Sequence, residues 1–280
     1  MSQEKASGKS RGYRNKKKVN IGDKGREVVE NIKEDNLVLQ LFGAYATELD
    51  DRHDRYERIV KIGRDITIES KRIIFLLHSI DKKSKQESVL AEAESRLRAV
   101  AENNFKAIAR ELEGQDPYFY LKAYRNGSEE YVEALTFFQY LSNSDMGGWV
   151  ELKNALSYID SEKGEAKSFQ ALVTPSEYIL GIADLTGELM RQCINNLALG
   201  ESASCYQTRN FVRNVYKGFL GCSNSSSKEI NRKVFTLKQS LQKIENVCYT
   251  IKVRGSEIPK HILVDVAIED IESDEGYQPY

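Results

Sequence analysis

Proline and cysteine are scarce in this chain. Only 4 of its 280 residues are proline, and a sequence with so few helix breakers, rich in Leu, Ile, Glu, Lys and Ala, is typical of long helices. Its 4 cysteines stand far apart without a Cys-x-x-Cys pair, which argues against a zinc site or a disulfide framework and favours reduced thiols. No apolar run approaches the roughly 18 residues of a membrane span, and the basic N-terminal stretch lacks the apolar segment of a secretory signal.

A large net charge is also absent. The 41 Lys and Arg residues nearly cancel the 42 Asp and Glu residues, which leaves a formal net charge of −1. This balance argues against a protein that coats nucleic acid by bulk attraction, although it leaves room for a local basic site. With 40% hydrophobic residues, the chain can bury a sizeable core.

Two charged segments flank an expected helical domain at residues 34–265. Residues 1–33 hold few apolar groups and two basic clusters, Lys9–Arg14 and Lys16–Lys18, so we expect a disordered tail there. The clusters fit either a nuclear import signal or a simple solvated tail. Residues 266–280 are expected to form an acidic tail.

Most of the domain has helical character. The first expected helix, 36–80, contains no proline, would exceed about 60 Å in length and therefore needs a partner along it. Glycine in the middle of a helix is unfavourable, so Gly127 marks a place where the third helix can break. The chain also has a long connection at 142–173 that holds one short helix. The six further helices are expected at 87–112, 117–141, 151–159, 174–199, 206–218 and 228–254.

Local signals support several of these helices. Gly63 and Ser70 are small residues on the apolar face of the first helix, and they allow a neighbouring helix to approach closely. Residues 174–177, Thr-Pro-Ser-Glu, have the arrangement of a capping box with proline at the first helical position. The last helix has an unbroken four-and-three apolar spacing from Ile230 to Ile251, which can pack inside a bundle or against another subunit.

Two of the expected helices carry acid pairs among apolar residues. Glu130 and Glu133 are three positions apart, so both project from one face of their helix. Asp184 and Glu188, four positions apart, do the same. Glu129 is as good a candidate as Glu130 when spacing alone is considered. Burying a carboxylate without a partner is costly, so four buried acids would need compensation.

These acids have two interpretations. If the pairs converge, their carboxylates form an oxygen-donor site for Mg²⁺ or Mn²⁺. Otherwise each pair lies on a solvated face, and Arg191 is a structural partner of Glu188. The chain has no phosphate-binding glycine motif, no His-Glu-x-x-His, no Gly-x-Ser-x-Gly and no Glu-x-x-His, so metal-activated water is its natural hydrolytic route.

Basic residues are numerous on the first helix. Between Arg52 and Arg64 they recur every three positions, and such steps wrap around a helix of 3.6 residues per turn rather than forming one stripe. The pattern therefore leaves open whether any of them contacts RNA. Arg64 and Arg191 are our candidates for holding phosphate.

Four segments, at 52–78, 129–137, 174–191 and 235–261, resemble the translin family. They occur in the family's order, and the likeness covers most of residues 35–265. Within the family the chain is similar to the translin-associated X subunits rather than to translin itself, which lacks the acid set. The resemblance implies an all-α bundle of about seven helices with a very long first helix.

The resemblance also implies an activity. Translin and the X subunit form a hetero-octamer that encloses RNA and acts as a Mg²⁺-dependent endoribonuclease on single-stranded or nicked RNA. The X subunit carries the active site, and the family's acids fall on Glu130, Glu133 and Asp184, with Glu188 as a further metal ligand. Mn²⁺ is expected to substitute for Mg²⁺.

The implied biological role is in RNA interference. Such a complex removes passenger-strand fragments of small interfering RNA and so activates the RNA-induced silencing complex, processes tRNA fragments in some organisms, and is expected in cytoplasm and nucleus. The competing hypothesis is a non-catalytic RNA- or DNA-binding adaptor that stabilises or positions translin, with acids that bind no metal.

Overall fold

The computed structural model describes residues 25, 36–80, 83–160, 167–199, 201–222, 228–255 and 257. The tails expected at 1–33 and 266–280 lie outside these residues, apart from Gly25. The chain divides into two units, 1–52 and 53–280.

The elements are, in order, α2 (Leu37–His78), α3 (Lys83–Ala99), the π-helical η1 (Val100–Phe105), α4 (Lys106–Glu111), the 3₁₀ turn η2 (Pro117–Phe119), α5 (Leu121–Asn143), α6 (Trp149–Ala155), β1 (Ser157–Asp160), β2 (Lys167–Gln170), α7 (Pro175–Ala198), α8 (Ser202–Cys222) and α9 (Lys228–Arg254).

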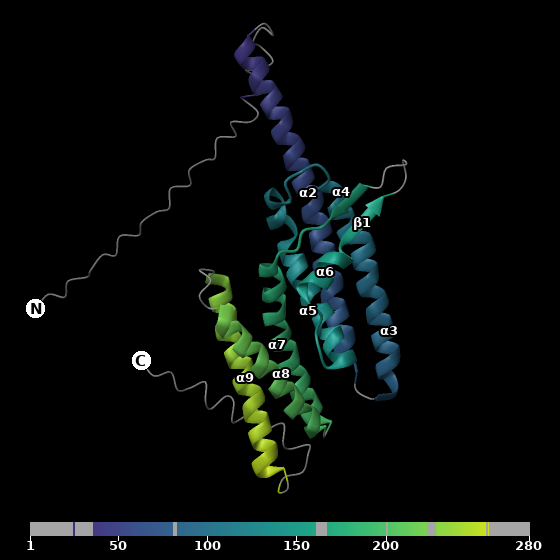
Figure 1. Ribbon diagram of the computed structural model, residues 1–280, viewed down its shortest axis with the longest axis vertical. Helices are drawn as coiled ribbons and strands as arrows, with labels where there is room; N and C mark the ends of the chain where they lie inside the picture. Colours follow the sequence, from purple (N-terminus) through teal and green to yellow (C-terminus); the bar gives the residue numbers. More distant parts are fainter. Residues whose placement is uncertain are drawn as a thin grey trace, which may run out of the picture. The chain divides into compact units, whose positions relative to one another are not determined.

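Helix α7 is the central packing element of the second unit. It packs against α5 on one side and α9 on the other, and α8 contacts both α7 and α9 (Figure 1). Its apolar residues explain this position, because half of α7 is buried, including Leu185, Leu189 and Cys193. The expected all-α fold with a very long first helix is confirmed.

Glycines allow α5 to approach two neighbouring helices. A Cβ on Gly127 would lie 2.6 Å from the backbone oxygen of Gly63 in α2, a distance that no real side chain tolerates. A Cβ on Gly181 in α7 would lie 2.7 Å from the backbone oxygen of Glu129. The expected close approach at Gly63 is confirmed, and Gly127 serves this contact without breaking α5.

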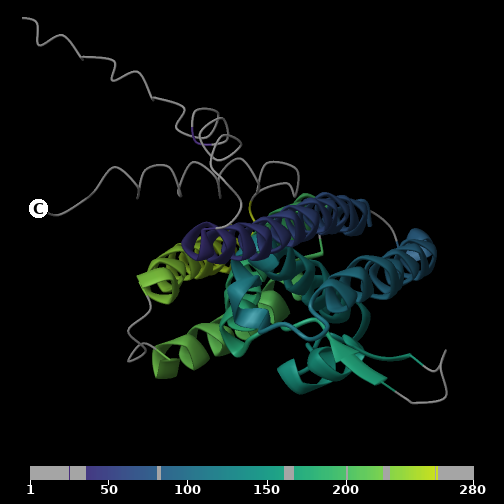
Figure 2. The ribbon, with the colours of Figure 1, turned by 90° about the horizontal axis from the view of Figure 1, so that it is seen from above.

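The connection between α5 and α7 differs from the expectation. The short helix predicted at 151–159 ends at Ala155, and 157–160 instead forms a strand that pairs antiparallel with β2, with Tyr158 opposite Phe169. The paired aromatic rings favour the strand, because such residues fit a pleated, half-buried surface. This hairpin lies at the periphery of the unit, next to α4 (Figure 1 and Figure 2).

The end of the same connection is tied to the bundle by two hydrogen bonds. Tyr124 Oη donates to the backbone oxygen of Leu172 at 2.8 Å, and Trp149 Nε1 donates to that of Val173, also at 2.8 Å. Thr174 then caps α7 in the expected capping box with Glu177, whose carboxylate accepts from the Thr174 backbone N–H at 2.9 Å. These contacts fix where α7 begins.

The apolar faces of α9 and of the first part of α2, both noted in the sequence, differ in how far they are buried in this chain. The seam of α9 is largely buried within this chain, including Leu237, Leu241 and Ile244, so it packs inside the bundle. The part of α2 that belongs to the first unit instead exposes Leu37, Val38, Leu41, Phe42, Tyr45 and Leu49. Along the residues described, no helix is both long and apolar enough to cross a lipid bilayer.

Candidate active site

Helix α5 carries three glutamates close together, and two of them face one cleft while the third turns away. Glu133 is buried, with only 9% of its surface exposed, and Glu130 is partly exposed one turn earlier. Both line the same cleft. Glu129, about 100° away around the helix, turns to Arg125 instead, whose Nε donates to it at 2.9 Å. The structure therefore separates Glu129 from Glu130, which sequence spacing could not do.

Helix α7 supplies the other two acids. Asp184 and Glu188 lie one turn apart and line the same cleft as Glu130 and Glu133. Gly181, one turn before Asp184, is the residue at which α7 comes against α5. The close contact of the two helices thus brings acids about 50 residues apart in sequence to one place.

The cleft has a volume of about 610 Å³. It is lined by four carboxyl side chains, three cationic side chains and two apolar side chains: Glu130, Glu133, Asp184, Glu188, Lys71, Arg191, Lys233, Ile74 and Phe75. The lining residues come from α2, α5, α7 and α9. Clusters of ionisable groups in a cleft are typical of functional sites.

Three of the four acids have partners on other helices. Lys71 Nζ lies 3.0 Å from Glu130 Oε1, and Lys233 Nζ donates to both carboxylate oxygens of Asp184. His78 Nε2 lies 2.5 Å from Glu188 Oε2. Glu188 also pairs with Arg191 at 3.3 Å, as the structural interpretation expected.

Glu133 is the exception. Among the described residues it has no ion pair with a Lys, Arg or His side chain. Burial raises its pKa to about 8, and repulsion from Asp184, Glu130 and Glu188 adds to the shift, which the charge of Lys233 opposes. At neutral pH this carboxyl group therefore tends to keep its proton, unless additional positive charge enters the cleft.

For Lys71 and Glu188, which have ion-pair partners, the pKa shifts favour the charged form of the side chain. The hydrogen bond and charge of Glu130 raise the pKa of Lys71, so that ammonium stays protonated. Burial would raise the pKa of Glu188, but the hydrogen bond with His78 and the charge of Arg191 outweigh it and hold the pKa below its ordinary value. The cleft thus contains three acids with ion-pair partners and one buried acid, Glu133, without one among the described residues.

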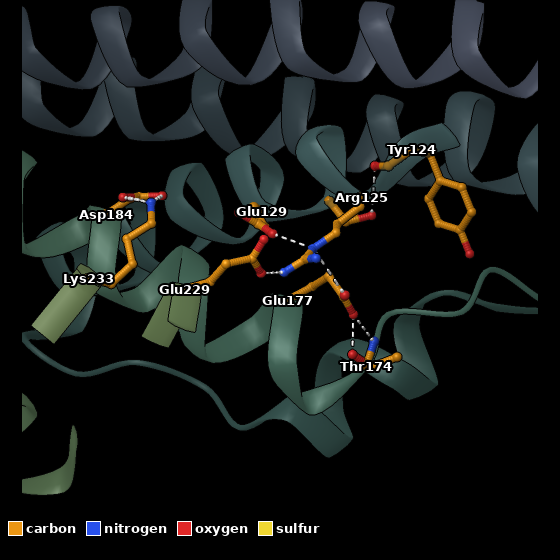
Figure 3. A network of polar contacts seen from close by, with 9 residues as sticks. Tyr124, Arg125, Glu129, Thr174, Glu177, Asp184, Glu229 and Lys233 are labelled. Carbon is orange, nitrogen blue, oxygen red and sulfur yellow. Dashed lines mark hydrogen bonds and ion pairs between the residues drawn. The ribbon is translucent and has the colours of Figure 1, made fainter. Parts of the chain in front are cut away.

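A second acidic group lies next to the cleft and is centred on Arg125 (Figure 3). The guanidinium group contacts Glu129, Glu177 and Glu229, which come from α5, α7 and α9. Burial raises the pKa of Glu129, although Arg125 counteracts the shift. We call Arg125 and these three glutamates the arginine cluster.

The sequence-based site residues can now be located. Glu130, Glu133, Asp184 and Glu188 share one cleft, as the hypothesis required, and Arg191 lines it with them. Arg64 is exposed on α2 and is not part of the cleft lining.

Sequence reasoning missed Lys71 as the partner of Glu130 and missed Lys233 and Phe75 in the cleft lining. It also missed His78 as the partner of Glu188. Helical spacing reveals only neighbours three or four residues apart, whereas Lys233 lies 49 positions from Asp184 and His78 lies 110 from Glu188. The only available signal was the position of His78 and Phe75 at the end of the long apolar helix.

The donor chemistry of the cleft suits a hard divalent cation. Mg²⁺ prefers carboxylate oxygens and water, and the buried, unpaired Glu133 is the kind of group whose charge such an ion would stabilise. As the side chains stand, no group of three or more His, Cys, Asp or Glu residues in the described part of the chain is arranged to hold a metal ion. Binding would require Lys71 or Lys233 to release its carboxylate.

The chain has relatives that match most of its sequence. A sequence model of the Translin family matches residues 54–255. Translin-associated protein X from Pongo abelii is 39% identical, and the alignment covers 99% of each chain. The protein of that name from Rattus norvegicus is 40% identical over 91% of this chain and 92% of its own. A homologue from Schizosaccharomyces pombe is 28% identical over 77% of this chain and 89% of its own.

Solved structures support the same fold. The crystal structure of AfC3PO aligns with a TM-score of 0.56 and 21% identity, covering 78% of this chain and 99% of that one. The structure of AfC3PO with duplex RNA aligns with a TM-score of 0.56 and 19% identity, covering 81% of this chain and 97% of that one. At this identity the likeness concerns the fold alone. The family match and the relatives near 40% identity nonetheless lead to one conclusion: this chain belongs to the translin family.

Proposed function

We propose that this chain is the catalytic subunit of a Mg²⁺-dependent endoribonuclease formed with translin. The observation that carries the proposal is the convergence of Glu130, Glu133, Asp184 and Glu188 on one cleft. One of the four, Glu133, is buried without an ion pair among the described residues, so an additional cation would stabilise its charged form. The four carboxyl groups are the donor set that a phosphodiester-cleaving metal site needs.

The acidic and the cationic residues of the cleft would have different roles in the reaction. Glu130, Glu133, Asp184 and Glu188 would hold the ion, which supplies Lewis acidity to the phosphodiester and an acidified water. Lys71, Lys233 and Arg191, released from their carboxylates, would contact the phosphate and balance the charge that develops on it. His78 holds Glu188 through Nε2 and thereby fixes its orientation.

The partner proposal rests on the surface of α2. Its first part exposes six large apolar side chains between Leu37 and Leu49, and such a surface is typical of a subunit interface. We propose that translin binds this surface, in the hetero-octamer that the family resemblance implies. The related AfC3PO has been solved with duplex RNA, which supports RNA as the ligand.

The substrates follow from the same resemblance. The complex would cleave single-stranded or nicked RNA, remove passenger-strand fragments of small interfering RNA to activate the silencing complex, and process tRNA fragments. It would act in the cytoplasm and in the nucleus, with the basic clusters Lys9–Arg14 and Lys16–Lys18 as the import signal. Deleting residues 1–18 and following a fluorescent fusion in cells tests the import signal.

A cleavage assay tests the catalytic proposal. The chain co-purified with translin should cut a labelled single-stranded RNA in Mg²⁺, lose activity in EDTA and recover it when Mg²⁺ or Mn²⁺ is restored. Asp184→Asn and Glu133→Gln should each reduce kcat by at least about 100-fold, because each removes a ligand charge. Size-exclusion chromatography must show that both variants still assemble.

A matched control is available in the arginine cluster. Glu229→Gln changes a neighbouring glutamate that contacts Arg125 rather than lining the cleft, and it should retain activity within about twofold. Equal activity of Asp184→Asn and wild type in assembled complexes would rule out the assignment.

One observation favours a second function. Three of the four acids are already paired with Lys71, Lys233 and His78, as in a structural ion-pair network. This suits a non-catalytic RNA- or DNA-binding adaptor that stabilises or positions translin. The adaptor hypothesis expects cleavage, if any, to be unaffected by Asp184→Asn and by EDTA.

A further inference from the structure

Phe75 is the most exposed large hydrophobic side chain among the described residues. It is 79% exposed, and it lines the cleft beside the four acids. Single exposed hydrophobic side chains are common, but this ring lies at the rim of a charged cleft, where a ligand bound in the cleft can cover its apolar surface.

The ring is held on a rigid support. Its neighbours Ile73, Ile74 and Leu77 are buried against the core, so this part of α2 cannot rotate without exposing them. Phe75 therefore projects from a fixed helix face. A side chain placed in advance loses little conformational freedom when it binds.

The surroundings of the ring indicate what kind of ligand covers it. Lys71 lies four residues earlier and so on the same face of α2, and Arg191 lines the cleft from α7. Cationic side chains that contact a backbone, next to an aromatic ring that stacks a base, are the combination by which proteins bind single-stranded nucleic acid. A purely apolar partner would leave Lys71 and Arg191 poorly solvated.

We infer that Phe75 is a platform on which one unpaired nucleobase of the RNA stacks, beside the acids that act on the backbone. This inference rests on the proposed function and adds the feature that selects the substrate. A base that stacks on Phe75 must be free of its own strand's helix, and unstacking it from a duplex is costly. The platform therefore favours single-stranded or nicked RNA over continuous duplex.

The first experiment measures cleavage by the complex with translin. The substrate is a single-stranded RNA in which one abasic nucleotide is moved through each position. For the wild-type complex, kcat/KM should fall by about 5- to 100-fold when the abasic nucleotide occupies one particular position near the cut. Phe75→Ala should show the same loss on intact RNA, mainly as a higher KM, and should no longer distinguish the abasic substrate at that position.

Two sets of variants separate stacking from ordinary apolar contact. Phe75→Tyr and Phe75→Trp keep a ring and should retain discrimination, whereas Phe75→Leu keeps apolar area and should lose it. Ile68→Ala is the matched control, because Ile68 is also exposed on α2, at 49%, but does not line the cleft. It should leave the abasic effect unchanged.

A binding experiment keeps this inference separate from catalysis. Glu133→Gln and the double variant Glu133→Gln/Phe75→Ala, both in complex with translin, are titrated with fluorescein-labelled intact and abasic RNA in Mg²⁺ and followed by anisotropy. The proposed function fails if the wild-type complex does not cleave RNA. The inference fails if Phe75→Ala weakens intact and abasic RNA equally, or if Phe75→Ala or Phe75→Leu breaks up the assembly in light scattering, which would place the ring against a protein subunit.

Discussion

The cleft and the arginine cluster are neighbouring groups of acids on the same helices, and they differ in how their charge is balanced. In the arginine cluster, one guanidinium contacts Glu129, Glu177 and Glu229. In the cleft, Glu133 is buried without an ion pair among the described residues, and its pKa rises to about 8. Glu129 and Glu130 are adjacent on one helix, yet Glu129 belongs to the structural arginine cluster and Glu130 belongs to the candidate catalytic cleft.

This difference teaches that acids in an apolar helix have no single meaning. An acid whose charge is met by a fixed arginine joins helices together, as Glu177 does at the start of α7. An acid left beside a cleft without such a partner is destabilising, and proteins keep that arrangement chiefly where it serves chemistry.

The largest effect on stability is expected from Arg125→Met. The change leaves Glu177, which is 3% exposed, and Glu129 without their shared cation. Removing one partner of a buried ion pair should lower the free energy of unfolding by about 3 kcal/mol. Urea unfolding of the complex, followed by circular dichroism, measures this change.

Two controls sharpen that comparison. Arg98→Met removes an exposed i,i+4 pair with Glu94 and should change stability by no more than about 0.5 kcal/mol. Glu133→Gln replaces a buried carboxyl group that has no ion pair among the described residues and tends to keep its proton, so it should leave stability unchanged or raise it by about 1 kcal/mol. If Glu133→Gln were as destabilising as Arg125→Met, the two groups of acids would not differ in the way described.

A smaller effect is expected where α7 meets α5. Gly181→Ala places a Cβ 2.7 Å from the backbone oxygen of Glu129, so α7 must shift away, at a cost of about 1–3 kcal/mol. The shift separates the acids of α5 from those of α7, and cleavage should fall by at least about tenfold. Thermal unfolding and the RNA cleavage assay measure the two effects.

Gly187→Ala is the matched control on the same helix. A Cβ there meets nothing within 4 Å, so alanine should stabilise the complex by about 0.5–1 kcal/mol through its better helix propensity. A loss of stability equal to that of Gly181→Ala would show that helix geometry, and not the contact with α5, sets the cost.

Lys233→Met tests the competition between internal cations and Mg²⁺. Lys233 holds both oxygens of Asp184, so its removal should lower the Mg²⁺ concentration for half-maximal cleavage by about threefold, the size of a partly exposed ion pair. Metal titration of the cleavage rate measures this value. A higher requirement for Mg²⁺ would mean that Lys233 supports the metal form instead of opposing it.

The smallest effects are expected from single phosphate contacts. Arg191→Gln, inside the cleft, should weaken RNA binding uniformly across sequences and reduce the salt slope of affinity by about 1. Arg64→Gln should have a smaller effect of the same sign, because Arg64 lies outside the cleft lining. Anisotropy titrations at several salt concentrations compare the two. An Arg64 effect larger than that of Arg191 would move the RNA path away from the cleft.

Much of the fold is readable from the sequence because its signals are local. The capping box at Thr174, the uninterrupted apolar face of α2 and the seam of α9 each act within a few helical turns, and each predicts its element closely. The strand at 157–160 was missed because a four-residue strand has too few positions for alternation to appear. Its stability comes from pairing with β2, ten positions further on.

Only part of the candidate site could be predicted from the sequence. The acids stand out because carboxylates are unfavourable in apolar helices, and that reasoning reaches Glu133 and Asp184 without any partner being known. Lys233 and Arg125 carry no such signal, since exposed helices contain many similar residues. Their roles depend on which helices cross, and the crossings depend on small residues such as Gly181 whose partners are far away in the chain.

The hydrogen bonds from Tyr124 and Trp149 to residues 172 and 173 have a practical consequence. They hold the chain immediately ahead of Thr174, so whatever precedes them cannot easily pull on α7. A fluorophore attached earlier in the connection, on the exposed side chain of Ile159, should therefore leave the acids of α7 in register.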